Sequence, residues 1–248
     1  MGRRQRAQRA LTRQLVYQEK KAARLRGHER DTILSMVQSS LRVRAILEGI
    51  HPINPDARVL EVGSGAHGHI FFFGAGQRVG VDPLAQSYAK LFPRWQRQAT
   101  TVAAFGESLP FDDSSFDLVL SDNVVDHAES PASIVAEIAR VLKPSGLLYF
   151  TVNIHHPIYA LASHVHAAWN DLGVKYEIGP FADHTVHLTL SRARRLFEGL
   201  PFSILRETSN IDETKAIAKQ SVPRHAGDRL KRFFFKNAVY EVIAVREN

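Results

Sequence analysis

The stretch "RVLEVGSGAHGHIFFF", residues 58–73, decides the fold. Its apolar, β-branched beginning predicts a buried strand, and Gly63, Gly65 and Gly68 follow with the spacing of a dinucleotide-binding loop. Glycines let the backbone turn sharply and approach a ligand closely. Asp82 lies about 20 residues further on, where an acidic partner for ribose hydroxyls is expected. The stretch therefore predicts a loop that holds NAD or a different nucleotide-like cofactor.

Composition excludes several classes of protein. The chain has 248 residues, 44% of them hydrophobic, which is enough for a sizeable core. It has no cysteine, so disulfides, thiolate zinc sites and a cysteine nucleophile are excluded. The N-terminus lacks the apolar segment of a secretory signal, and no apolar run approaches the length of a membrane span. We therefore expect a cytoplasmic protein.

The positive charge of the chain is concentrated at its N-terminus. The net charge is +7, and residues 1–31 hold ten Lys or Arg against three Asp or Glu, so the remainder is neutral overall. We interpret residues 1–50 as a basic helical extension and residues 51–248 as the main domain. The extension is expected to pack on the domain or on a second subunit, as in a homodimer. Contact with nucleic acid or a membrane is the alternative, although a neutral domain gives nucleic acid little support.

From Pro52 the sequence alternates between strand and helix patterns. Strands are predicted at 57–63, 77–82, 100–105, 116–122 and 146–153, and two more at 202–208 and 238–247. Helices are predicted within the segments 83–92, 131–146 and 191–200; in the second, Lys143 is expected in the last helical turn and Gly146 just past the end of the helix. The run Phe71–Phe73 is interpreted as buried helix packing. The alternation predicts an α/β, Rossmann-like, mostly parallel sheet with helices on both faces.

Residues 155–190 interrupt this alternation. They are rich in histidine and aromatic residues and have no clean period. We interpret them as a lid or substrate-recognition insertion after the fifth strand.

Four segments together resemble the class I S-adenosylmethionine-dependent methyltransferases. They are "VLEVGSGAHG", "VGVDPL", "GESLPFDDSSFDLVLSDNVVDH" and "ARVLKPSGLLYFTVN", in this order, and span about residues 57–154. The resemblance implies a seven-stranded sheet with the last strand inserted antiparallel, and S-adenosylmethionine as the cofactor.

The resemblance also implies a set of cofactor-binding residues at the carboxyl ends of the first, second and fourth strands. They are Glu61, Gly63, Ser64, Gly65, Asp82, Pro83, Leu84, Gly106, Glu107, Asp122 and Asn123. The four residues of this set from Glu61 to Gly65 would hold the methionine end, and Asp82 would bind the ribose. The adenine would be surrounded by Pro83, Leu84, Gly106 and Glu107. Asp122 and Asn123 would close over the sulfonium side. Phe105 departs from the family pattern, because members often carry an Asp there for the adenine amino group.

Methyl transfer is an in-line displacement, and a general base assists an acceptor that must lose a proton. The candidate bases are His127, just past the fourth strand, and His155 and His156, just past the fifth. The alternative for each of these histidines is a structural role in packing or hydrogen bonding. We expect no metal site, although His164-x-His166 and His184-x-x-His187 have spacings that occur in zinc sites.

The leading prediction is methyl transfer to a small or medium organic acceptor, with O-methylation ahead of N-methylation. An RNA methyltransferase that uses the basic extension is the second hypothesis. Against this hypothesis, the sequence lacks the Asn/Asp-Pro-Pro-aromatic motif that base N-methylating families often have after the fourth strand. A non-catalytic S-adenosylmethionine-binding protein and an NAD oxidoreductase are the remaining alternatives.

Overall fold

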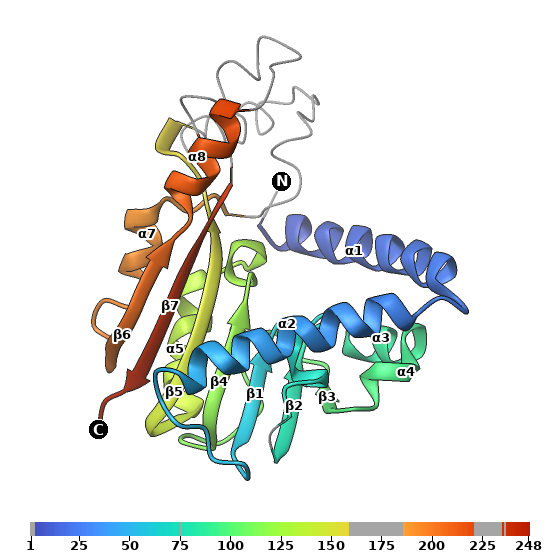
Figure 1. Cartoon of the computed structure of the whole chain (residues 1–248), viewed down its shortest axis with the longest axis horizontal. Helices are drawn as coiled ribbons and strands as arrows, with labels where there is room; N and C mark the ends of the chain where they lie inside the picture. Colours follow the sequence, from blue (N-terminus) through green and yellow to red (C-terminus); the bar gives the residue numbers. More distant parts are fainter. Residues whose placement is uncertain (1–2, 75, 159–185, 221–234, 236) are drawn as a thin grey trace.

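The computed structural model describes residues 3–74, 76–158, 186–220, 235 and 237–248, with the backbone alone for residues 3–10 (Figure 1). Its strands are β1 (Arg58–Val62), β2 (Gln77–Val81), β3 (Thr100–Val102), β4 (Phe116–Asp122), β5 (Leu142–Ile154), β6 (Phe202–Ser209) and β7 (Ala238–Arg246). Its helices are α1 (Arg3–Leu25), α2 (Arg30–Glu48), α3 (Ala85–Leu91), α4 (Pro93–Gln96), α5 (Pro131–Val141), α7 (Leu190–Arg195) and α8 (Ile211–Gln220). Two short 3-10 helices are η1 (His69–Phe71) and η2 (Val125–His127).

The strands form one seven-stranded sheet in the order β3-β2-β1-β4-β5-β7-β6. The first five strands pair in parallel, whereas β7 runs antiparallel to both β5 and β6. The predicted fold is confirmed, including the antiparallel last strand. The strand order reverses between β1 and β4, and ligands of open α/β sheets bind beyond the carboxyl ends of the strands at such a point.

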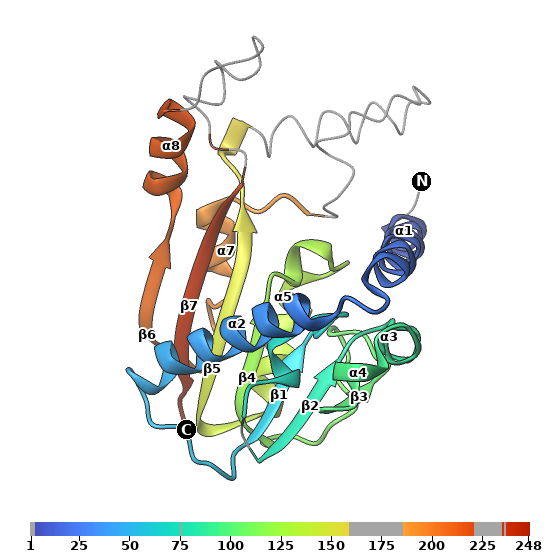
Figure 2. The ribbon, with the colours of Figure 1, turned by 45° about the vertical axis from the view of Figure 1, so that its right-hand side comes forward.

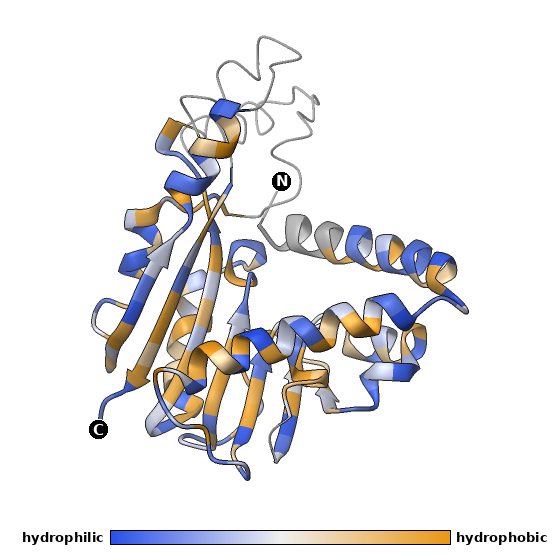
Figure 3. Cartoon of the chain, in the orientation of Figure 1, coloured by the Kyte–Doolittle hydropathy of each residue, from blue (hydrophilic) through white to orange (hydrophobic). Residues whose placement is uncertain are grey.

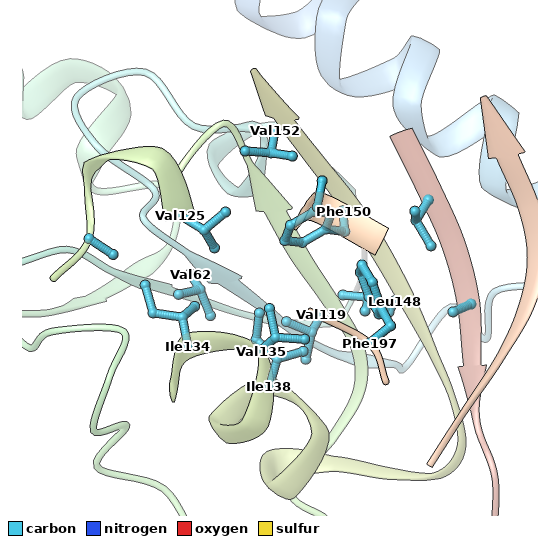
Figure 4. Packing of buried hydrophobic residues seen from close by; sticks show 14 of the residues in the cluster. Val62, Val119, Val125, Ile134, Val135, Ile138, Leu148, Phe150, Val152 and Phe197 are labelled. Carbon is cyan, nitrogen blue, oxygen red and sulfur yellow. The ribbon is translucent and has the colours of Figure 1, made fainter. Parts of the chain in front are cut away.

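The central strands are apolar on both faces because helices cover both. Leu60 and Val62 of β1 lie in a core cluster with α5, where Ile134 and Ile138 form the inner stripe of that helix (Figure 4). Val59 of β1 points to the opposite face and joins a second cluster. This two-sided burial explains the nearly continuous apolar runs of the strands.

The second cluster lies beneath α2. Met36, Val43 and Leu47 of α2 are buried in it together with Phe71 and Phe73. Helix α2 thus shares a core with the sheet, although the sequence grouped it with the N-terminal extension. Of the run predicted to pack as a buried helix, Phe71 and Phe73 are buried and Phe72 is partly buried, but the run lies in η1 and the following loop and not in a longer helix.

Helix α5 ends earlier than its sequence pattern predicted. It stops at Val141, and Leu142 is already extended and begins β5. Lys143, predicted in the last helical turn, instead forms an ion pair with Asp117, whose carboxylate lies 2.6 Å from Nζ. The chain then turns at Ser145, which has φ +61°. Apolar residues continue from the helix into the strand, so the sequence pattern did not indicate where the helix ends.

Helices α1 and α2 lie on one side of the sheet and meet at Gly27, which has φ +82° (Figure 1). Turning the molecule shows α1 next to α3 beside the carboxyl ends of the strands (Figure 2). Apolar residues concentrate on the central strands, and polar residues on the outer surface of α1 and in the loops (Figure 3). Within the described ranges, no helix has the length and apolar character needed to cross a membrane.

Candidate functional site

A cavity of about 1000 Å³ opens at the carboxyl ends of β1, β2 and β4. It brings together eight of the eleven predicted cofactor-binding residues and one of the three candidate bases. They are Gly63, Gly65, Asp82, Pro83, Leu84, Gly106, Glu107, Asn123 and His127. Residues from four separate loops thus meet at the point where the strand order reverses.

The glycine loop needs its glycines for conformation and for space. Gly63 has φ +73°, and a Cβ atom on it would lie 2.4 Å from Cγ2 of Val124. Gly65 has φ +53°, and its N–H donates to Oδ2 of Asp82 at 3.2 Å. The loop therefore lies against Val124 on one side and against the end of β2 on the other.

Asp82 joins the glycine loop to the loop that follows β2. Its Oδ1 accepts a hydrogen bond from the Leu84 N–H at 2.8 Å, in addition to the bond from Gly65 to Oδ2. Burial raises the pKa of Asp82 above its usual value, and the two backbone donors partly oppose that rise. These bonds fix the carboxylate in the cavity wall, where it can accept hydrogen bonds from ligand hydroxyl groups.

The loop after β3 forms the adjoining wall. Oε1 of Glu107 accepts a hydrogen bond from the Glu129 N–H at 3.0 Å, which ties this loop to the segment before α5. A Cβ atom on Gly106 would lie 2.9 Å from Cγ1 of Val62, so the backbone packs directly on β1. Phe105 also lines the cavity, and 53% of it is exposed.

Glu61 lies outside the cavity lining, although the resemblance assigned it to the methionine end. It is buried, and its two carboxylate oxygens accept the backbone N–H groups of His69 at 3.1 Å and Ile70 at 2.8 Å. Burial raises the pKa of Glu61 to about 7. Its position fits an alternative role in which it holds η1 against the sheet and so shapes the glycine loop.

Ser64 also lies outside the cavity lining and is buried. Its side chain packs on β2, because a Cβ atom on Gly80 would lie 2.7 Å from Ser64 Oγ. The Ser64 N–H donates to the Val81 carbonyl at 3.0 Å, so both the side chain and the backbone of Ser64 hold the loop against β2.

Replacing Glu61 by glutamine is expected to flatten the dependence of stability on pH. Between its usual pKa of 4.5 and about 7, the folded protein holds a proton on Glu61 that the unfolded chain has lost. Stability therefore falls as pH rises through this window, by about 3 kcal/mol for the full shift. The pKa of His69 is also raised, so its contribution is lost in the same direction, above its usual value of 6.5.

Urea unfolding of both proteins at pH 5 and pH 7.5 measures this difference. The wild type is expected to lose stability relative to Glu61→Gln as pH rises. Parallel changes in the two proteins would show that Glu61 does not titrate in this window.

Asp122 is held by two side chains that the sequence did not point to. Its Oδ2 lies 3.0 Å from Nε2 of His69, and its Oδ1 accepts a hydrogen bond from the Thr151 hydroxyl. Burial opposes ionisation of Asp122, but these two hydrogen bonds outweigh it and lower its pKa. The side chain remains 40% exposed beside the cavity, next to Asn123 in the wall. Asp122 is thus a fixed anion at the carboxyl end of β4.

The three candidate bases lie in different surroundings. His127 lines the cavity, its side chain is half exposed, and its Nε2 lies 3.9 Å from Oδ1 of the buried Asp126. His155 is buried, with its ring 4.7 Å from that of His187. The ring of His156 lies 5.5 Å from that of Phe235. Neither His155 nor His156 is among the residues lining the cavity.

The other histidines singled out in the sequence give no metal site to describe. His164, His166 and His184 lie outside the described residues, as does most of the predicted insertion 155–190. Within the part of the chain that the structure describes, no group of three or more His, Asp or Glu residues could hold a metal ion.

One wall of the cavity comes from the N-terminal extension. Four residues of α1 line it together with the loops after β2 and β3: Leu11, Arg13, Gln14 and Tyr17. The thin apolar stripe of α1 predicted a helix that packs on something, but it did not indicate which surface. The extension therefore belongs to the site.

Comparison with known proteins relates the central part of the chain to methyltransferases. Residues 60–150 match a family model described as a methyltransferase domain. The match covers less than half of the chain. An uncharacterized methyltransferase of Mycobacterium leprae (strain Br4923) is 32% identical over 143 residues, which cover 56% of this chain and 45% of that protein. The chain thus spans less than half the length of that curated relative.

Two solved structures are similar to this chain in fold. The YcgJ protein of Bacillus subtilis is similar over 85% of this chain and 99% of its own, with a TM-score of 0.58 and 19% identity. Phosphoethanolamine N-methyltransferase 2 of Haemonchus contortus is similar over 85% of this chain and 53% of its own, with a TM-score of 0.59 and 17% identity. The second was solved with phosphomonomethylethanolamine and S-adenosylhomocysteine. At these identities the likeness concerns the fold alone.

Proposed function

We propose that the protein transfers a methyl group from S-adenosylmethionine to a small or medium organic acceptor. The observation that carries the proposal is the cavity at the carboxyl ends of β1, β2 and β4, which gathers the glycine loop, Asp82 and His127. The methyltransferase family model over residues 60–150 supports the same reaction class.

The residues of the cavity fit an adenosyl cofactor. Gly63 leaves no space for a side chain, and Asp82 presents a carboxylate that is fixed by two backbone donors. In this proposal Asp82 accepts hydrogen bonds from the ribose hydroxyls, and Pro83 and Leu84 contact the adenine. Gly106 and Glu107 lie at its edge.

A fixed negative charge suits the other end of this cofactor. S-adenosylmethionine carries a positive sulfonium and an ammonium group, and its methyl group is already activated for transfer. Asp122, anionic and held by His69 and Thr151, lies next to Asn123 in the cavity wall. In this proposal the pair closes over the sulfonium side and attracts the positive end of the cofactor.

His127 is the candidate base that the cavity supports. It would accept the proton from an acceptor hydroxyl or amine, while the cavity walls exclude water. A histidine base suits a hydroxyl acceptor, so we favour O-methylation over N-methylation. A cavity of about 1000 Å³ is at the upper end of small-molecule sites and gives room for an acceptor beside the cofactor.

The structure weakens the argument for RNA methylation that the basic charge of the extension suggested. Helix α1 supplies a wall of the cavity, so it has a role that needs no nucleic acid. Affinity for RNA that fell steeply with added salt would revive the RNA hypothesis.

Replacing Asp82 by alanine tests the proposed cofactor site. We expect affinity for S-adenosylhomocysteine to fall between about 5-fold and 150-fold, because hydrogen bonds to a charged group contribute about 1–3 kcal/mol. Calorimetric titration measures the loss, and Asp112→Ala, on the exposed loop before β4, is the matched control. Equal affinity in the two variants would contradict the placement of the ribose.

Transfer of an isotope-labelled methyl group tests the reaction itself. Labelled S-adenosylmethionine is incubated with pools of hydroxyl-bearing and amine-bearing acceptors. The proposal expects the protein to label acceptors in at least one of these pools. Tight cofactor binding without labelling of any pool would favour the non-catalytic alternative.

A further inference from the structure

Two aromatic side chains are exposed and yet face the same cavity. Tyr17 of α1 is 60% exposed, and Phe105 of the loop after β3 is 53% exposed. Large apolar side chains with this much exposure are informative when they gather at one place, because most such residues are buried. The two belong to segments almost 90 positions apart in the sequence, so it is the fold that brings both to one cavity.

Helix α1 is held over the cavity by contacts of its own. Gln18 is buried, and Ala22 and Leu25 pack on the cluster beneath α2. One turn before Gln18, the Gln14 side chain lies close to that of Tyr88, a buried residue of α3 that also lines the cavity. The C-terminal part of α1 is therefore anchored, and the residues just before it, Leu11 and Tyr17 among them, line the cavity.

Tyr88 connects this helix to the carboxylate at the end of β2. Burial raises the pKa of Tyr88, and the nearby charge of Asp82 raises it further. The hydroxyl is thus neutral and able to hydrogen-bond with Gln14. The contact between α1 and the domain lies beside the residue that the proposed function assigns to the ribose.

The walls around Tyr17 and Phe105 suit a flat, aromatic ligand group. Leu84 and Pro83 line the same cavity from the loop after β2. Aromatic side chains stack on a purine face, and the contact is worth about 1–3 kcal/mol per base. A planar ring bound between Tyr17, Phe105 and Leu84 would be recognised through stacking and apolar contacts to its two faces.

We propose that α1 is part of the cofactor site and that Tyr17 and Phe105 enclose the purine ring of the methyl donor. This inference rests on the proposed function and adds to it a role for the N-terminal extension. The extension would cover the adenosine end of the cofactor, and cofactor binding would in turn hold α1 in place.

Calorimetric titration with S-adenosylhomocysteine tests the inference without any acceptor. We expect Tyr17→Ala and Phe105→Ala each to weaken binding about tenfold, within the range that base stacking gives. Tyr17→Phe keeps the ring and should stay within about twofold of the wild type. Val16→Ala is the matched control, because Val16 is the preceding residue of α1, is 42% exposed and is not among the cavity-lining residues.

A second probe locates the effect along the cofactor. 5′-Methylthioadenosine has the purine and ribose but lacks the amino-acid tail, so it should show the same fold loss in Tyr17→Ala and Phe105→Ala. A loss for S-adenosylhomocysteine with none for 5′-methylthioadenosine would overturn the placement at the purine.

Hydrogen exchange distinguishes a cofactor cover from a merely structural helix. Amide exchange in residues 11–25 should slow when S-adenosylhomocysteine is added to the wild type, and slow less in Tyr17→Ala. If the wild type binds and Tyr17→Ala behaves like Val16→Ala in both measurements, the inference is wrong while the proposed function stands. If the wild type binds neither probe, the proposed function is wrong and the inference with it.

Discussion

Replacing His127 by alanine is expected to lower the rate of methyl transfer about 100-fold or more while leaving affinity for S-adenosylhomocysteine nearly unchanged. A positioned general base contributes about 10²- to 10⁴-fold to such a reaction. Of the three histidines that the sequence suggested, His127 lines the cavity, whereas His155 and His156 do not. Its half-exposed ring can reach an acceptor, and the buried carboxylate of Asp126 lies 3.9 Å from its Nε2.

The rate is measured as S-adenosylhomocysteine formed with an acceptor found in the pools described above. His28→Ala is the control, because His28 is exposed in the connection between α1 and α2. Wild-type turnover in His127→Ala would remove His127 as the base. A loss of cofactor affinity that accounts for the whole loss of rate would assign it to binding instead.

Replacing Gly63 by alanine is expected to destabilise the fold by about 2–5 kcal/mol. A non-glycine residue in the left-handed region costs about 1–2 kcal/mol, and forcing extra atoms into a packed site costs about 1–3 kcal/mol more. Both costs apply here, because Gly63 has φ +73° and the new Cβ would lie 2.4 Å from Val124. Displacement of Val124, which lines the cavity, should also weaken cofactor binding.

Two variants separate the costs. Gly199 has φ +74° with nothing within 4 Å of its Cβ position, so Gly199→Ala reports the conformational cost alone. Adding Val124→Ala to Gly63→Ala removes the clashing methyl groups and should recover part of the loss. Urea unfolding gives the free energies. If Gly63→Ala cost no more than Gly199→Ala, close packing of the loop would be excluded.

Local sequence patterns were sufficient for the central part of the fold. The strands at Arg58–Val62 and Phe116–Asp122 follow from apolar runs, and the glycine loop from its spacing. Eight of the eleven predicted cofactor-binding residues line one cavity because each follows a parallel strand, and the carboxyl ends of these strands meet at one edge. These features depend on residues close together in the sequence.

The remaining features depend on contacts between distant segments. Glu61 is separated from the cavity because η1 folds back and gives it two backbone donors, which no motif indicates. The hydrogen bonds of Asp122 come from His69 and Thr151, 53 and 29 positions away. The place of Tyr17 is set by the direction in which α1 leaves Gly27, and a single glycine in a sequence does not specify a direction.

The measurement that tests the central claim most directly is calorimetric titration of the protein with S-adenosylmethionine, S-adenosylhomocysteine and NAD in parallel. The account predicts saturable binding of the first two at one site and no binding of NAD. Binding of NAD alone would mean that the Gly63-x-Gly65-x-x-Gly68 loop holds a dinucleotide, and the proposed methyl transfer would be contradicted.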